Sequence, residues 1–126
     1  MRIFKNKWFV KFAKKEGIDD QQLVKAVADA ESGKIDANYG GGVIKQRIAR
    51  EGGGKSGGYR SIILYLRGNK AFFVYGFSKK DQDNINRDEE TYFKKLAKVT
   101  LRMTDKEISA VLKEGTFVEL KNNGEN

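Results

Sequence analysis

A hairpin pattern in the middle of the chain constrains the fold most. Residues 59–66 and 71–77 are rich in Ile, Val, Tyr and Phe, and only Arg67-Gly68-Asn69-Lys70 lies between them. β-Branched and aromatic residues favour strands, and a short connection containing Gly-Asn favours a tight turn between antiparallel strands. Residues 43–49 form a third run of this composition. We therefore expect a mainly antiparallel sheet at the centre of the fold.

Helical patterns lie on either side of this region in the sequence. Four segments combine apolar residues at helical spacing with residues that begin or end helices: 8–17, 19–33, 84–103 and 104–115. Asp19 is expected to cap the second helix, and Thr104 with Glu107 to form a capping box for the fourth. Short strands are expected at 2–5 and 116–120, a loop at 35–42 and a loose polar tail at 121–126.

These elements predict an α+β fold. The expected architecture is a small, mainly antiparallel sheet with the N-terminal helices packed on one face, followed by C-terminal helices. The length of 126 residues and the lack of an interdomain linker predict a single domain, residues 1–126.

The composition excludes several kinds of site. The chain has no Cys and no His. A disulfide framework, thiolate zinc or iron-sulfur sites, a cysteine nucleophile and a histidine base are therefore excluded. We expect no metal and no cofactor, so that any catalysis uses other side chains. No apolar run approaches the ~20 residues of a membrane span, and residues 1–5 lack a signal-peptide core, so a soluble cytoplasmic protein without membrane contact is expected.

Positive charge is concentrated in one part of the chain. The net charge is +8, and residues 43–80 hold nine basic residues but only one acidic residue, Glu51. This distribution is typical of a protein that presents one basic surface to a polyanion. A face that only aids solubility is the plainer alternative, and membrane-surface binding usually involves a basic amphipathic helix rather than strands. Nucleic acid is the preferred partner.

A glycine-rich stretch at residues 49–56 fits a relaxed phosphate-loop pattern with alanine in place of the first glycine. A true phosphate loop lies between a strand and the N-terminus of a helix. Here strand-like sequence follows from Tyr59, so nucleotide hydrolysis is not expected. The glycines would instead let Lys55, Ser56 and backbone amides approach a phosphate. The alternative is a plain hairpin loop whose glycines only provide positive φ angles.

Strand alternation predicts which side chains share a face of the sheet. Lys45 and Arg47 lie on one face of their strand, while Ile44 and Ile48 lie on the other, which the helices are expected to cover. The cations are thus expected on an open face.

The hairpin adds aromatic residues to this face. Tyr75 and Phe77 share a face with Lys79, just beyond the end of the strand, so that aromatic and cationic groups could converge as stacked bases and phosphates require. Phe73 is assigned to the core, and the side of Tyr75 is left open. Arg60 falls on the side of Ile62 by alternation, although a distorted strand start could rotate it.

Three motifs of this region occur together: Lys45-Gln46-Arg47-Ile48-Ala49-Arg50, Gly54-Lys55-Ser56-Gly57-Gly58-Tyr59-Arg60, and Phe72-Phe73-Val74-Tyr75-Gly76-Phe77-Ser78-Lys79-Lys80 with Asn84-Ile85. In them the chain resembles the RelE/ParE superfamily of toxins, most of all its HigB-like RelE branch. The resemblance covers nearly all of the chain, including the aromatic first helix and the helix at Thr104-Asp105-Lys106-Glu107. It implies a cognate antitoxin that blocks the basic face, and inhibition of translation by cleavage of mRNA in the ribosomal A site.

The resemblance also implies a metal-free mechanism. Attack by the neighbouring 2′-OH needs a base, cations that stabilise the phosphorane, and an acid, and toxins of the RelE type are similar in using Lys, Arg and Tyr for these roles. Arg47 and Arg60 are expected to clamp the scissile phosphate. Lys55 or Lys79 would transfer protons or stabilise charge; crowding by other cations lowers a lysine pKa, which lets a lysine act in proton transfer. Tyr75 would stack on a nucleobase of the RNA or orient it. The other expected substrate-binding residues are Lys45, Ser56 and Lys80.

Two other functions stay open at this point. A ParE-like toxin would poison DNA gyrase without cleaving RNA and would tolerate Lys55→Ala and Arg60→Ala; the Gly-Lys-Ser-Gly-Gly element argues against it. A noncatalytic nucleic-acid-binding module would bind with a steep salt dependence and cleave nothing. For the endonuclease, Arg60→Ala is expected to abolish growth inhibition while the fold and antitoxin binding stay nearly intact.

Overall fold

The central hairpin forms as predicted. In the computed structural model, which describes residues 1–49 and 58–121, β4 (Tyr59–Leu66) and β5 (Lys70–Ser78) pair antiparallel. Their register sets Tyr59 opposite Ser78 and Leu66 opposite Lys70. Gly68 in the connection has a φ of 72°, which glycine adopts without the steric cost that a Cβ would add.

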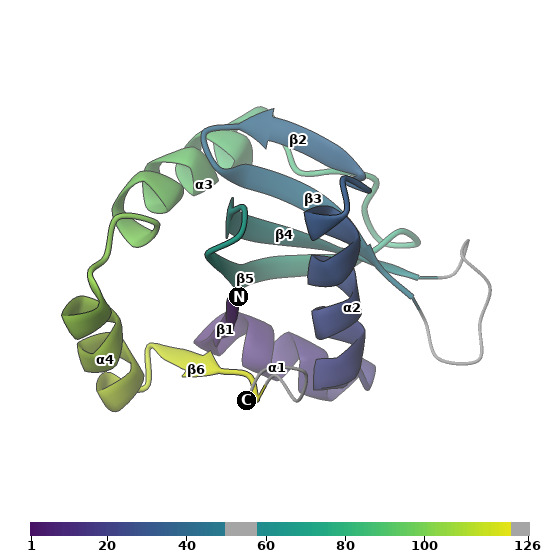
Figure 1. Ribbon diagram of the computed structural model, residues 1–126. Helices are drawn as coiled ribbons and strands as arrows, with labels where there is room; N and C mark the ends of the chain where they lie inside the picture. Colours follow the sequence, from purple (N-terminus) through teal and green to yellow (C-terminus); the bar gives the residue numbers. More distant parts are fainter. Residues whose placement is uncertain (50–57, 122–126) are drawn as a thin grey trace.

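Four further strands extend the hairpin into a sheet. Within the described residues the sheet has six strands in the order β2-β3-β4-β5-β1-β6 (Figure 1). β3 (Val43–Ile48) is antiparallel to β4, β1 (Arg2–Asn6) is parallel to β5, and β6 (Phe117–Glu119) is antiparallel to β1. The loop predicted at residues 35–42 is wrong in part, because β2 (Ala37–Gly40) pairs with β3 at the edge of the sheet. The mainly antiparallel α+β fold is confirmed.

The described helices begin at side-chain caps. They are α1 (Lys7–Glu16), α2 (Asp20–Glu31), α3 (Arg87–Thr100) and α4 (Asp105–Glu114). Asp19 caps α2 and Thr104 caps α4, as predicted. The third helix begins later than predicted because Asn86 caps it, accepting a hydrogen bond from the Glu89 N–H at 2.8 Å. In the part of the chain that the structure describes, no helix is long and apolar enough to cross a membrane.

Helices lie on both faces of the sheet (Figure 1). α1 and α2 cover one face, here called the α1/α2 face, where Phe9 and Leu23 pack with Phe73. This confirms the prediction for the N-terminal helices. The opposite face, here called the α3 face, was expected to be open, but Phe93 of α3 packs there in a cluster with Phe72. The expectation fails because Phe72 and its neighbours on this face are apolar and must be removed from water.

Candidate functional site

β3 and β4 bring three of the predicted cations together. Ile44 and Ile48 pack on the α1/α2 face, as predicted, so the alternating positions Lys45 and Arg47 lie on the α3 face. In the antiparallel register Arg47 is directly opposite Arg60. Directly opposite residues have Cβ atoms about 5 Å apart. The two arginines are therefore close neighbours on one face.

A β-bulge in β5 places Tyr75 on the same face. Ile62 lies opposite Tyr75, whereas the next residue, Ile63, lies opposite Phe73, so Val74 is an extra residue in β5. Phe73 packs on the α1/α2 face, as predicted, while Tyr75 packs against the cluster on the α3 face. Without the bulge, alternation would place both aromatic residues on one face. The bulge thus settles the side of Tyr75.

Arg60 is buried and paired with a carboxylate. It lies on the side of Ile62, as alternation predicts, and is 6% exposed. Its Nε is 3.2 Å from Oδ2 of Asp36, and Nζ of Lys45 is 3.8 Å from the same oxygen. Its Nη1 is buried and has no hydrogen-bond partner among the described residues. Two cations share one carboxylate, and the guanidinium keeps one buried donor that the described residues leave unsatisfied.

Asp36 is a site residue that sequence patterns missed, because it stands just before β2 in the stretch expected to be a loop. Its position is fixed by Gln46, which is 2% exposed. The Gln46 Oε1 accepts a hydrogen bond from the Asp36 N–H at 3.1 Å, and its Nε2 donates to the carbonyls of Ala26 and Lys34 at 2.9 and 2.8 Å. A buried glutamine therefore ties the carboxylate's backbone to α2 and β3.

Asp36→Asn is expected to lower the free energy of unfolding by about 1–3 kcal/mol. The change keeps the shape of the side chain but leaves the buried Arg60 guanidinium without its carboxylate; the 24% exposure of the Asp36 side chain keeps the expected loss below that of a fully buried pair. Urea denaturation measures the effect. Asp83→Asn, at an exposed position after β5, is the matched control and should be neutral. Equal midpoints for the two variants would show that the pairing with Asp36 contributes nothing to stability.

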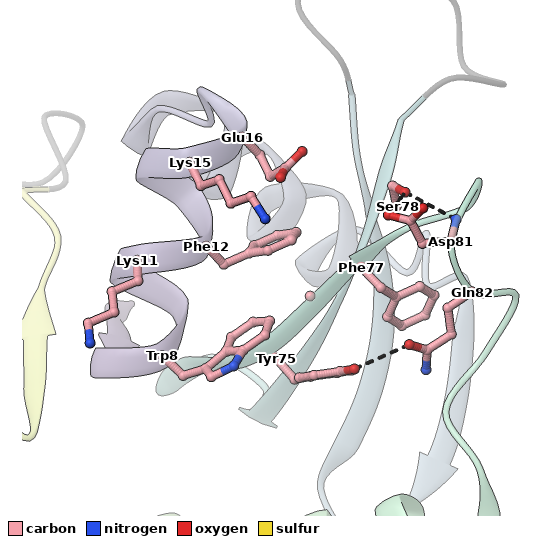
Figure 2. Close-up of a pocket in the computed structure, with 11 residues that line it drawn as sticks. Trp8, Lys11, Phe12, Lys15, Glu16, Tyr75, Phe77, Ser78, Asp81 and Gln82 are labelled. Atoms are coloured by element: carbon pink, nitrogen blue, oxygen red, sulfur yellow. Dashed lines mark hydrogen bonds between the residues drawn. The ribbon is translucent and has the colours of Figure 1, made fainter.

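The Tyr75 hydroxyl is a donor rather than a base. It donates a hydrogen bond to Oε1 of Gln82 at 3.2 Å (Figure 2). Burial, and next the charge of Glu89, raise the pKa of Tyr75, outweighing the hydrogen bond to Gln82, which lowers it. Near neutral pH the side chain is therefore uncharged and offers a hydroxyl and a ring face.

The other predicted site residues lie outside this group of three cations and Tyr75. Lys79 and Lys80 are exposed in the turn after β5, where the Ser78 hydroxyl donates to Asp81 at 2.9 Å. Ser78 lies opposite Tyr59, the residue before Arg60, so the turn is at the same end of the sheet as the arginine pair. The predictions for Lys55 and Ser56 fall in residues 50–57, outside the described part of the chain.

No metal site is evident: residues 1–49 and 58–121 contain no group of three or more acidic side chains that could hold a metal ion. What the described residues bring together is Lys45, Arg47, Arg60 and Tyr75.

These features define a class: a small α+β protein whose sheet sets an exposed arginine opposite a buried one, beside an aromatic residue, an arrangement that suits a polyanion. Residues 1–120 match the family described as the RelE toxin of the RelE/RelB toxin-antitoxin system, and the chain belongs to this family. It is therefore a toxin of a toxin-antitoxin system, with an antitoxin as its partner. No curated protein matches the chain at a significant level. The predicted superfamily is confirmed, and the HigB-like branch stays a prediction.

Proposed function

We propose that this toxin is a ribosome-dependent mRNA endonuclease that acts in the cytoplasm, uses no metal ion and inhibits translation. The observation that carries the proposal is the placement of Arg47 and Arg60 directly opposite each other on β3 and β4. Two adjacent guanidinium groups suit a single phosphate whose oxygens gain charge in the transition state.

The two arginines differ in exposure, which supports a different role for each at the phosphate. Arg60 is buried and held by Asp36, so it provides a donor array that is fixed before substrate arrives. Arg47 is exposed and free to follow the substrate. A fixed donor lowers the cost of reorganisation during the reaction, and a mobile cation helps to capture the phosphate.

The proposed reaction is an internal transesterification. The 2′-oxygen loses its proton to a base and bonds to phosphorus, the bond from phosphorus to the 5′-oxygen breaks, and an acid protonates the leaving oxygen. The products are a 2′,3′-cyclic phosphate and a 5′-hydroxyl. We assign proton transfer or charge stabilisation to Lys55 or Lys79, and the orientation of a nucleobase of the RNA to Tyr75. Contacts to the RNA backbone are assigned to Lys45, Ser56 and Lys80.

Induction of the chain in bacteria, followed by mapping of transcript ends by primer extension, tests the proposal. We expect cuts at in-frame codon positions of translated messages and none in the same RNA when it is free of ribosomes. Toxin that is treated with a chelator and desalted before it is added to the ribosomes should cut as well as untreated toxin. Arg47→Ala should remove the cuts, whereas Arg102→Ala, at an exposed arginine in the turn after α3, should leave them.

Two results would contradict the proposal. Growth arrest without any cuts would favour a gyrase poison, and no arrest at all would favour a noncatalytic binding module.

A further inference from the structure

β5 continues beyond the end of β1, its parallel neighbour. The register of β1 ends with Lys5 opposite Phe73, and Asn6 then caps α1 while its Nδ2 donates to the Val74 carbonyl at 3.1 Å. α1 therefore runs beside the second half of β5, where β1 has left the sheet. A pocket of about 400 Å³ lies between this helix, the end of β5 and the turn that follows (Figure 2).

Aromatic rings line the pocket. The Trp8 ring stacks on Phe12, with centroids 5.2 Å apart and planes inclined by 16°, and it also contacts Tyr75 with a centroid distance of 4.7 Å. Trp8 nevertheless remains 44% exposed. Gly76 permits this arrangement, because a Cβ there would lie 2.5 Å from the Phe12 ring. A large ring surface is thus left uncovered beside a cavity.

The surroundings of the pocket favour an anion. Lys11 and Lys15 contribute to its lining from α1, and Lys79 and Lys80 are exposed in the turn that supplies its far side. The carboxylates in the lining are Glu16 and Asp81, and Asp81 already accepts a hydrogen bond from the Ser78 hydroxyl. The lining itself holds two lysines and two carboxylates, and Lys79 and Lys80, between the lining residues Ser78 and Asp81, add positive charge beside it. Together with the stack of rings, this charge suits a flat group that carries a negative charge.

The pocket adjoins the arginine pair. Phe77 connects them, because it lines the pocket and is directly opposite Arg60, and Tyr75 lies two residues before it in β5. A chain that places its phosphate between the arginines could therefore place a neighbouring base in the pocket. We propose that this pocket binds one unpaired base of single-stranded RNA, stacked on Trp8 with its phosphate near Lys15. The proposal rests on the proposed function and adds a base-binding subsite to it.

Trp8 is the only tryptophan of the chain, so its fluorescence reports directly on the pocket. The probe is a hexanucleotide of single-stranded RNA with 2′-O-methyl groups, which lack the nucleophile needed for cleavage. We expect the hexanucleotide to quench Trp8 fluorescence in the full-length toxin. Anisotropy of the labelled probe should show binding about tenfold weaker for Trp8→Leu, as expected when one base loses its stacking partner. Tyr92→Leu, at a 60% exposed aromatic residue outside the pocket, is the matched control and should bind as the wild type does.

A second pair of variants tests the charge. Lys15→Ala should weaken binding and lower the salt dependence, whereas Lys14→Ala, at the preceding exposed position and outside the pocket, should change binding less. Cleavage of translated mRNA by the Trp8→Leu toxin should shift in its preference among codons.

Several outcomes would overturn the proposal. Unchanged binding and an unchanged cleavage pattern for Trp8→Leu, with both lost for Arg47→Ala, would reject the pocket while the endonuclease assignment stands. Quenching of Trp8 by the antitoxin but not by RNA would assign the pocket to a protein partner. Quenching by RNA without cleavage on ribosomes would support the pocket but reject the endonuclease.

Discussion

Replacing Arg47 by alanine is expected to lower cleavage of translated mRNA about 100- to 1000-fold and to abolish growth inhibition. The free energy of unfolding should change by less than about 0.5 kcal/mol, because the side chain is exposed. The large loss of rate follows from its position opposite Arg60, where it would neutralise charge that develops on the phosphorane. Cleavage on programmed ribosomes and urea denaturation measure the two effects.

Arg47→Lys separates charge from geometry. Lysine keeps the positive charge but loses the two parallel N–H donors of the guanidinium, so it should restore only part of the rate. Full activity of Arg47→Ala would remove this residue from the site. Equal activity of the lysine variant and the wild type would show that a point charge is sufficient.

Arg60→Ala is a poorer test than the sequence indicated. Sequence alone predicts a nearly intact fold for this variant, but Arg60 is 6% exposed and its Nε is 3.2 Å from Asp36. Removal of the side chain would leave a cavity and deprive Asp36 of a partner, so stability should fall together with activity. Loss of toxicity in this variant therefore cannot be assigned to chemistry without a measurement of folding.

Local sequence was enough to predict the elements whose causes are local. The Gly-Asn connection specified the β4–β5 hairpin, and the side chains of Asp19 and Thr104 specified two helix starts. Alternation also placed Lys45 and Arg47 on one face correctly, because β3 pairs with β4 without a register shift along its whole length.

Features that depend on pairing between strands could not be predicted in this way. The extra residue at Val74 reverses the alternation of β5, and nothing in the composition of Ala71–Phe77 marks it. β2 was missed because its four residues end in glycine and are held mainly by pairing with β3. Since Asp36 stands just before β2, its contact with Arg60 was hidden with the strand.

Gln46→Ala is expected to lower the free energy of unfolding by about 2–4 kcal/mol. The side chain is 2% exposed and bonds to the N–H of Asp36 and the carbonyls of Ala26 and Lys34, so its removal breaks three hydrogen bonds, one of them buried and two partly buried. Urea denaturation with an unchanged m-value would measure the loss, and Gln21→Ala, at an exposed position of α2, should be neutral.

The same variant relates stability to the site. Gln46 fixes the backbone of Asp36 from the α1/α2 face, while the Asp36 carboxylate pairs with Arg60 and Lys45 on the α3 face. Loss of the glutamine should therefore loosen Arg60 as well, and cleavage per folded molecule should fall less than in Arg47→Ala because both arginines remain. A Gln46→Ala protein with the midpoint of the wild type would mean that water replaces all three hydrogen bonds, and the rigid placement of Asp36 would then need another cause.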